Sequence, residues 1–238
     1  MGEFSKIEWT DHSFNPWIGC SKVSPGCAHC YAETMNKRMK WAEWRPGGKR
    51  FRNSERYRRL PYRWNSRAAV KRERVFCASM ADWLDPDAPD EWRTDLINLI
   101  RETPNLDWLL LSKRIELFSD FKIELPKNVW LGVTAENQEM WDKRLPVLLS
   151  IPATVHFVSA EPLLGPVKMG DYRPDWIIAG GESGPGARPT KSEWIKNLRD
   201  ECDTRTAFFF KQWGGLSPKT AGRELDGRTY SALPTPKT

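Results

Sequence analysis

The chain has 238 residues, of which 39% are hydrophobic and 29% charged, and its formal net charge is +6 at pH 7. This length and composition predict one folded domain over 1–238 with a sizeable core, and they exclude an intrinsically disordered chain. The sequence has no apolar run near the roughly 20 residues that a membrane-spanning helix needs, and its first residues lack the apolar stretch of a signal peptide. We therefore expect a cytoplasmic protein.

Three of the five cysteines fall within eleven residues near the amino terminus. Cys20, Cys27 and Cys30 have the spacing Cys-x6-Cys-x2-Cys, and the other two stand apart. This placement does not suit a disulfide framework, whereas clustered thiolates are ligands for zinc or for an iron–sulfur cluster. A structural zinc site needs a fourth ligand, for which His12 and His29 are the nearest candidates. The spacing alone leaves an iron–sulfur cluster, zinc and no metal open.

A helix predicted over 28–43 begins at the cysteine cluster, and a strongly basic stretch follows over 45–74. This stretch has twelve Lys and Arg against two Asp and Glu, a net charge of +10, whereas the remainder has 25 basic and 29 acidic residues. Aromatic residues are interleaved with the arginines, as on surfaces that contact phosphates and stack on bases. The alternative is a solvated loop whose arginines pair with acidic neighbours. We expect a basic insertion that contacts a polyanion through Arg56, Arg58 and Arg59.

Downstream of the basic stretch, short apolar runs alternate with helical patterns. Strands are predicted at 75–79, 108–112, 129–134, 154–160, 176–180 and 207–211, and helices at 90–102, 115–121, 137–149 and 191–202. Continuous apolar strands with helices between them are typical of a parallel sheet covered by helices, joined by right-handed crossovers. The sequence therefore predicts an α/β fold, either a barrel or an open sheet, with a flexible tail over 229–238.

Polar residues follow each predicted strand. They are Ser79 and Asp82, then Lys113 and Arg114, then Thr134, Glu136 and Asn137, then Glu161, then the GGESG loop of 180–184, then Lys211 and Gln212. The carboxyl ends of parallel strands converge on one face, where ligands bind, although a chain leaving a sheet also becomes polar because it reaches water. Glu161 and Lys211 directly follow strongly apolar runs. We expect them, together with Lys113, to contact a substrate.

Five blocks of the sequence resemble a known family. They are WTDHSFNPWIGCSKVSPGCAHCYAE, NVWLGVTAEN, FVSAEPLLGPV, DWIIAGGESGPGARP and FFFKQWGG. These blocks occur in family order and are similar to those of phage-associated three-cysteine proteins of the radical S-adenosylmethionine superfamily, a family often described only as a domain of unknown function. The resemblance runs through most of the chain. It says least about the structure of the basic stretch over 45–74, which contains none of the five blocks.

The resemblance implies a partial (β/α)6 barrel that binds cofactors at its carboxyl-terminal face. It implies a [4Fe–4S] cluster held by Cys20, Cys27 and Cys30, with S-adenosylmethionine on the fourth iron. An electron from the cluster, supplied by an electron-donor protein, would cleave S-adenosylmethionine to methionine and a 5′-deoxyadenosyl radical, which takes a hydrogen from the substrate. The first gap of six residues, where the commonest superfamily motif has three, matches the narrower family.

The resemblance also indicates which residues bind the cofactor. An aromatic residue precedes the last cysteine of the common motif; here His29 has that position and Tyr31 follows the cysteine. The glycines of the GGESG loop permit close approach of the backbone to a ligand. The expected cofactor-binding residues are His29, Tyr31, Ser79, Thr134, Glu136, Gly180, Gly181, Glu182 and Ser183.

The basic, aromatic stretch favours a nucleic acid, nucleotide or nucleoside as the substrate, which the enzyme would repair or modify. A duplex base must leave its stack before a buried radical can reach it. The alternative is a non-catalytic, zinc-dependent nucleic-acid-binding module, and a third hypothesis is that a partner protein supplies the substrate. Cys77 lies in a predicted strand and is expected to be a small buried hydrophobic residue. A position near the cleft would instead allow its thiol to donate a hydrogen atom to a radical.

Overall fold

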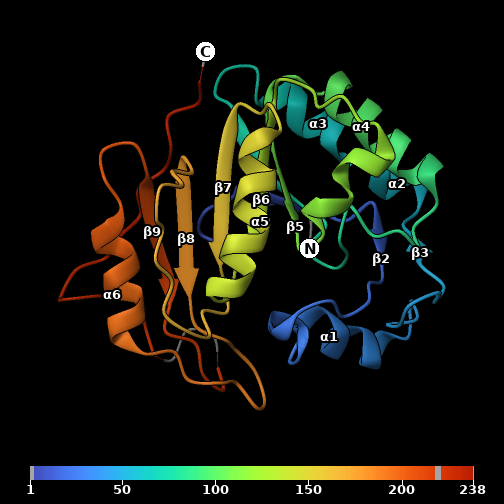
Figure 1. The fold of residues 1–238 in the computed structure, drawn as a ribbon. Helices are drawn as coiled ribbons and strands as arrows, with labels where there is room; N and C mark the ends of the chain where they lie inside the picture. The colour runs from blue at the N-terminus through green and yellow to red at the C-terminus, as the bar shows by residue number, and fades with distance from the viewer. Residues whose placement is uncertain (1–2, 218–220, 238) are drawn as a thin grey trace. The chain divides into compact units, whose positions relative to one another are not determined.

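The computed structural model describes residues 3–217 and 221–237 (Figure 1). Its main sheet has seven strands whose spatial order, β1-β4-β5-β6-β7-β8-β9, follows the chain. These strands are β1 (His12–Phe14), β4 (Glu73–Cys77), β5 (Leu106–Ser112), β6 (Val129–Thr134), β7 (Val155–Ala160), β8 (Trp176–Gly180) and β9 (Ala207–Gln212). A separate antiparallel pair consists of β2 (Trp17–Ile18) and β3 (Phe51–Arg52).

The helices lie between the strands in sequence. They are α1 (Tyr31–Met39), α2 (Glu55–Arg58), α3 (Leu60–Arg67), α4 (Asp90–Glu102), α5 (Gln138–Ser150) and α6 (Ser192–Glu201), with 3-10 helices at Pro25–Cys27 and Ile115–Phe121.

The six strands predicted from apolar runs are all confirmed, each within two residues of its expected ends. The helices expected at 90–102, 137–149 and 191–202 are confirmed within one residue, whereas 115–121 forms a 3-10 helix. One predicted helix was wrong in its extent, and one strand of the main sheet was missed. The early helix is shorter than 28–43, since α1 begins only after Cys30 and ends at Met39, and the strand β1 was not predicted.

The chain divides into two compact units. The first consists of Met1–Val23 and Ala32–Leu131, and the second of Ser24–Tyr31 and Gly132–Thr238. The chain passes from the first unit to the second within β6. A single domain with a basic insertion stays a prediction.

In the first unit, β4 pairs in parallel with β1 and with β5. Phe14 lies opposite Cys77, so the carboxyl ends of β1 and β4 are in register, and Cys77 lies opposite Leu110, two residues before the end of β5. Phe14, Cys77 and Leu110 are all buried. Helix α4 begins with two acidic residues and has Arg101 in its last turn, which complements the helix dipole.

In the second unit, β8 pairs in parallel with β7 and β9, and Trp176 at the start of β8 is fully buried. Helix α5 is capped by Asn137, whose side-chain oxygen accepts a hydrogen bond of 3.0 Å from the N–H of Met140. Helix α6 buries Ile195 and Leu198 on one face. Helices α5 and α6 thus each bury an apolar stripe.

The segment after β9 contacts the strands. The N–H of Phe210 donates to the carbonyl of Tyr230 at 3.0 Å, and the indole Nε1 of Trp176 donates to the carbonyl of Ala232 at 3.0 Å. Flexibility of 229–237 stays a prediction, and residue 238 lies outside the described residues. None of the described helices combines the length and hydrophobicity needed to cross a membrane.

Candidate cofactor site

The first of the three clustered cysteines, Cys20, lies at the carboxyl ends of β4 and β5 in the first unit. The N–H of the preceding Gly19 donates to the carbonyl of Met80, just beyond β4, at 3.0 Å. Gly19 has φ of +115°, and a Cβ there would lie 2.8 Å from the side chain of Arg50. Glycine is therefore required where the backbone turns toward Cys20.

Arg114, directly beyond β5, connects Cys20 to a buried carboxylate. Its Nη1 lies 3.4 Å from the sulfur of Cys20 and 3.1 Å from Oδ2 of Asp82, and its Nη2 donates to the carbonyl of Ser21 at 2.8 Å. Asp82 also accepts hydrogen bonds from the hydroxyl of Ser112 and from the N–H of Lys113. This network fixes a guanidinium group against the cysteine sulfur.

The ionisation of Cys20 reflects two opposing effects. Burial raises the pKa of its thiol to about 12, although the nearby charge of Arg114 acts in the other direction. Cys20 is therefore protonated in the metal-free protein at neutral pH, and metal binding must displace that proton.

Cys27 and Cys30 belong to the second unit, where Glu136 anchors their loop. The N–H of Gly26 donates to Oε1 of Glu136 at 2.8 Å. The Glu136 side chain is fully buried beyond β6, and Arg144 of α5 donates to its Oε2 at 3.0 Å. Burial acts to raise the pKa of Glu136, but its hydrogen bonds and Arg144 outweigh burial and lower it. The loop is thus bound to a buried carboxylate at a strand end.

A second anchor comes from Glu182, beyond β8. Nδ1 of His29 lies 2.9 Å from Oε2 of Glu182, and Nη2 of Arg188 lies 2.5 Å from Oε1 of the same carboxylate. Arg188 also donates to the carbonyl of Pro25 at 3.0 Å. The loop that carries Cys27 and Cys30 is therefore held at two points, on the carboxyl ends of β6 and β8.

The ionisation of Glu182 makes this second anchor dependent on pH. Burial acts to raise its pKa, but hydrogen bonds from Arg188 and His29 outweigh burial and lower the pKa from 4.5 to about 2. Because the folded value lies below the unfolded one, this carboxylate stabilises the fold above about pH 4, and the contribution is lost as the pH falls toward 2.

We expect Arg188→Met to lower the free energy of unfolding by about 2 kcal/mol at neutral pH. The difference from the parent protein should shrink below about pH 4, because Glu182 becomes protonated in both proteins. Urea unfolding at neutral and acid pH measures it. Arg205→Met, which removes an exposed pair with Asp203, is the matched control and should change little. A loss that is equal at both pH values would contradict the assignment to Glu182.

Other strand-end residues of the second unit pair with one another. Nζ of Lys211 lies 3.0 Å from Oε1 of Glu161, and Oε2 of Glu161 accepts from the hydroxyl of Ser159 at 3.2 Å. These two candidate substrate-binding residues therefore neutralise each other at the ends of β7 and β9.

Two glycines of the GGESG loop, Gly180 and Gly181, lie close to other parts of the chain. A Cβ on Gly181 would lie 1.9 Å from the carbonyl oxygen of Trp213, and one on Gly180 would lie 3.1 Å from the carboxylate of Glu161. The side chain of Ser183 accepts from Gln212. The sequence predicts that the backbone of this loop lies close to a ligand, and at Gly181 the close neighbour is the backbone of Trp213.

The remaining candidates have different environments. Thr134 is fully buried in the second unit, and its carbonyl accepts from Arg144 at 2.7 Å. Tyr31 is exposed. In the first unit, Ser79 is buried and bonded to Asn15. The structure therefore places both Ser79 and Thr134 at strand ends, as expected from the sequence.

The two histidines considered as zinc ligands already have partners. Nε2 of His12 lies 2.8 Å from Glu73, and its ring stacks on Trp64 at 4.3 Å between ring centroids. His29 bonds Glu182, as described above. Within residues 3–217 and 221–237, no three His, Cys, Asp or Glu side chains form a ready-made metal site. The histidine contacts thus give no support to a fourth zinc ligand.

The chemistry of the cysteines fits an iron–sulfur cluster. All five cysteines are free thiols. The sulfur of Cys20 has the guanidinium of Arg114 beside it, and the hydroxyl of Ser24 lies 3.9 Å from the sulfur of Cys27. Hydrogen-bond donors next to the sulfur atoms are a general means of tuning such clusters. Cys77 is fully buried, as expected from its strand.

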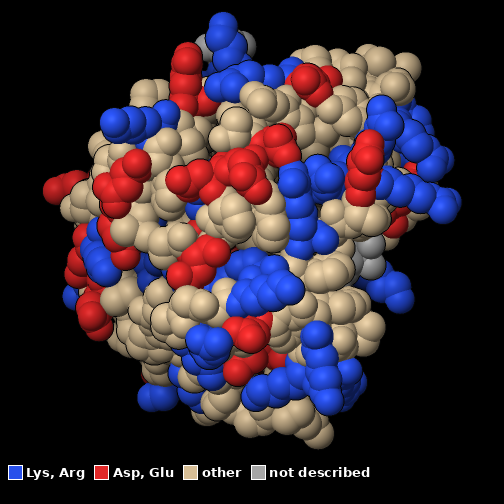
Figure 2. All heavy atoms as spheres, turned by 90° about the vertical axis from the view of Figure 1, so that its right-hand side faces the viewer, with Lys and Arg blue, Asp and Glu red and all other residues tan. Residues whose placement is uncertain are grey.

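The basic stretch is folded and largely ion-paired. It forms α2 and α3 rather than the solvated loop of the alternative hypothesis, but the ion pairing that this alternative included is present. Its pairs include Arg50–Asp85, Arg52–Asp95, Arg58–Asp95, Arg59–Glu55, Arg67–Glu73, Arg72–Asp107 and Arg74–Asp11. On the face that Figure 2 shows, Lys and Arg gather with carboxylates between them.

Two residues of the anchors were missed from the sequence. Arg144 recurs at helical spacing with the buried Met140 and Leu148, and an arginine on the apolar face of a helix is a signal for a buried carboxylate partner. Arg188 gave no such signal, because it lies in an irregular segment whose partner is fixed only by folding.

Comparisons with known proteins agree with this fold. No curated protein matches the sequence. A spore photoproduct lyase double mutant with bound AdoMet and dinucleoside spore photoproduct is similar in structure, with a TM-score of 0.54 and 12% identity, over 90% of this chain and 59% of the lyase. A spore photoproduct lyase complexed with dinucleoside spore photoproduct has a TM-score of 0.53 and 10% identity, over 86% and 64%. The chain thus spans about three fifths of the lyases' length.

The fold class predicted from the sequence is confirmed. The chain has an α/β fold with a curved sheet of parallel strands, like the fold of these lyases. The family model described as "Protein of unknown function (DUF5131)" matches residues 4–234. Because this match covers nearly the whole sequence, the chain belongs to the DUF5131 family.

Proposed function

We propose that this protein is a radical S-adenosylmethionine enzyme that acts on a nucleic acid, nucleotide or nucleoside. The observation that carries the proposal is the anchoring of the Cys27 and Cys30 loop to strand ends, through Gly26 on Glu136 and His29 on Glu182. Parallel α/β folds bind their ligands at these ends. The likeness in fold to an AdoMet-bound lyase supports the same proposal.

In this proposal, Cys20, Cys27 and Cys30 hold a [4Fe–4S] cluster. When bound, the cluster would supply one electron for the reductive cleavage of S-adenosylmethionine, the chemistry by which a hydrogen atom could be taken from the substrate. The electron comes from a donor protein, for which a chemical reductant substitutes in an assay. The chain itself contributes the thiolates, the Arg114 donor at Cys20 and the two carboxylate anchors.

The structure suggests different roles for the proposed cofactor-binding residues. Glu136 and Glu182 already accept hydrogen bonds from the cysteine loop and from Arg144 and Arg188, so we assign them as positioning residues. Contacts to S-adenosylmethionine are assigned to residues that present backbone or short side chains at strand ends. These are Ser79, Thr134, Gly180, Gly181 and Ser183, with His29 and Tyr31 beside the last cysteine.

The substrate class rests on charge and on the substrate of the structural neighbours. Those lyases are described with a dinucleoside photoproduct bound. In this chain, Lys113 and the Glu161–Lys211 pair lie at strand ends, and the arginines of α2 and α3 provide positive charge. Whether the reaction is repair or modification, whether a partner protein delivers the substrate, and the phage-associated and cytoplasmic setting stay predictions.

The test is anaerobic reconstitution of the full chain with iron and sulfide. We expect a brown protein with about four iron and four labile sulfide atoms per chain, which produces 5′-deoxyadenosine from S-adenosylmethionine only when a reductant is added. The same purified protein is assayed without reductant as a control. Stoichiometric zinc with no labile sulfide would reject the proposal in favour of the zinc-dependent binding module.

A further inference from the structure

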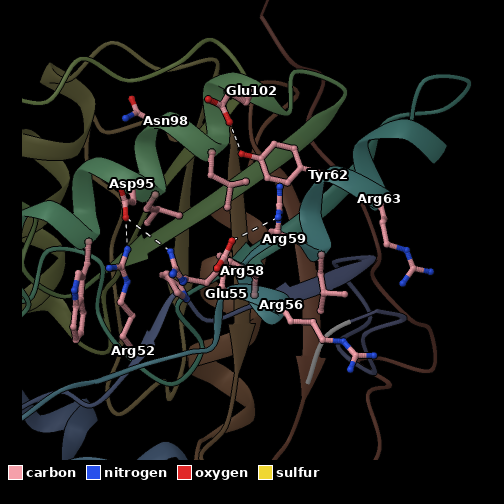
Figure 3. A pocket seen from close by; sticks show the side chains of 16 residues that line it. Arg52, Glu55, Arg56, Arg58, Arg59, Tyr62, Arg63, Asp95, Asn98 and Glu102 are labelled. Atoms are coloured by element: carbon pink, nitrogen blue, oxygen red, sulfur yellow. Dashed lines mark hydrogen bonds and ion pairs between the residues drawn. The ribbon is translucent and has the colours of Figure 1, made fainter.

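A groove of about 820 Å³ lies in the first unit between α2, α3 and α4 (Figure 3). Its lining includes five arginines and three carboxylates, an excess of two positive charges. The arginines are Arg52, Arg56, Arg58, Arg59 and Arg63, and the carboxylates are Glu55, Asp95 and Glu102. Leu60, Leu96 and Leu99 contribute apolar surface. The groove therefore suits a ligand that has both anionic and apolar parts.

The wall formed by α2 and α3 is fixed by aromatic packing. The ring of Tyr57 stacks on Phe14, the last residue of β1, at 5.4 Å between centroids and 4° between planes. The hydroxyl of Tyr57 accepts from the N–H of Asn15 at 3.1 Å, and Trp64 is fully buried. Ordering this wall thus adds little entropic cost when a ligand binds.

Three arginines lie on successive turns of this wall. Arg56, Arg59 and Arg63 are spaced by three and four residues, and all three are exposed. At 1.5 Å per residue, Arg56 and Arg63 are about 10 Å apart along the helical direction, assuming that the two short helices continue one another. A row of three guanidinium groups over this length can contact successive phosphates along one strand.

These three arginines differ from their neighbours in their partners. Arg52 and Arg58 are joined to Asp95, as the dashed lines in Figure 3 show. The Arg59–Glu55 pair is exposed and 3.5 Å long, and because exposed pairs contribute little energy, Arg59 can exchange Glu55 for a phosphate. In the described part of the chain, no ion pair engages Arg56 or Arg63. The row therefore has positive charge available for a ligand.

An aromatic ring lies on the same wall. Tyr62 is 40% exposed, and its hydroxyl donates to Glu102 of α4, which fixes the direction of the ring. An exposed ring beside a row of arginines is the combination with which proteins bind single-stranded nucleic acid, because bases stack on the ring while phosphates meet the arginines.

We propose that this groove binds a single-stranded segment of nucleic acid, with phosphates on Arg56, Arg59 and Arg63 and a base on Tyr62. The proposal deepens the proposed function, on which it rests, by naming a polynucleotide strand as the substrate class. It differs from the set expected from the sequence in that Arg63 takes the place of Arg58, whose guanidinium also donates to the carbonyl of Asn53 at 3.2 Å.

The charge test compares two triple variants by fluorescence anisotropy with labelled single-stranded DNA and RNA. Arg56→Gln/Arg59→Gln/Arg63→Gln should weaken binding at least tenfold and make the slope of log affinity against log salt shallower by about 2, since three phosphate contacts are lost. The matched control, Arg38→Gln/Lys122→Gln/Lys168→Gln, removes the same charge from exposed sites elsewhere. Equal losses in both variants, or an unchanged slope, would overturn the assignment.

The stacking test uses one position. Tyr62→Ala should weaken binding of single strands about tenfold, and Tyr62→Phe, which keeps the ring, should retain affinity. Tighter binding of duplex than of single strands, or equal binding of polyglutamate, would overturn the proposal. A preference for DNA or for RNA would support the proposal and would show which of the two is the ligand. Nucleic-acid binding is measured without cofactor, so the two proposals can fail separately. A protein that assembles an active cluster but does not bind single strands in the groove contradicts only the groove proposal. A protein that binds single strands but assembles no cluster contradicts only the radical function.

Discussion

Replacing Cys27 with alanine is expected to abolish assembly of the iron–sulfur cluster and reduce the production of 5′-deoxyadenosine to background. The reason is that a cluster with one free iron needs three thiolates, and the chain offers no substitute beside Cys27, whose neighbour His29 bonds Glu182. Iron and sulfide content and reductant-dependent cleavage of S-adenosylmethionine measure the outcome. This is the largest effect expected of any single substitution.

The matched control is Cys202→Ala. Cys202 follows α6, and its thiol donates to the carbonyl of Leu198 at 3.2 Å, so the substitution removes a partly buried thiol outside the proposed cluster. We expect this variant to keep its iron, sulfide and cleavage activity. The Cys27 variant should unfold at nearly the same temperature as the metal-free parent, because the contact between Gly26 and Glu136 does not involve the sulfur. Retained deoxyadenosine production in Cys27→Ala would remove it from the ligand set.

The strands that the sequence predicts correctly are those whose burial is encoded locally. The run at 176–180 is apolar throughout, and β8 forms at those residues with all five residues buried. β1 was missed because its three residues, His12–Phe14, are short and partly polar. Its strand conformation depends on pairing with β4, where His12 lies opposite Val75. A pairing partner more than sixty residues away leaves no periodic signal in the sequence.

The site separates in the same way into local and long-range parts. The cysteine spacing and the polar residues after strands can be read directly from the sequence. The anchors cannot, because Gly26 is 110 residues from Glu136 and His29 is 153 residues from Glu182. These contacts also occur where the helix predicted over 28–43 was wrong, since residues 28–30 precede α1 in the anchored loop. Tertiary contacts there prevail over helical propensity.

The pair formed by Arg144 and Glu136 is buried, with side-chain exposures of 1% and 0%. Arg144→Met is therefore expected to lower the free energy of unfolding by about 3–5 kcal/mol at neutral pH, because it leaves Glu136 without its buried cation. The double variant Arg144→Met/Glu136→Gln removes both charges at nearly constant volume. It should recover much of the loss, as buried pairs exchanged for neutral groups often do. Urea unfolding of the three proteins measures these differences.

The pH dependence of Arg144→Met distinguishes a lost ion pair from lost packing. In the parent protein, the hydrogen bonds and Arg144 keep the pKa of Glu136 below its ordinary value. Without Arg144, burial becomes dominant and raises the folded pKa of Glu136, so protonation of this carboxyl favours the folded state. The deficit of the single variant should therefore shrink as the pH falls from neutral to about 5, while that of the double variant should not change. A deficit of the single variant that is the same at both pH values would mean that the methionine fails to replace the packing of Arg144 and that the charge of Glu136 is unimportant.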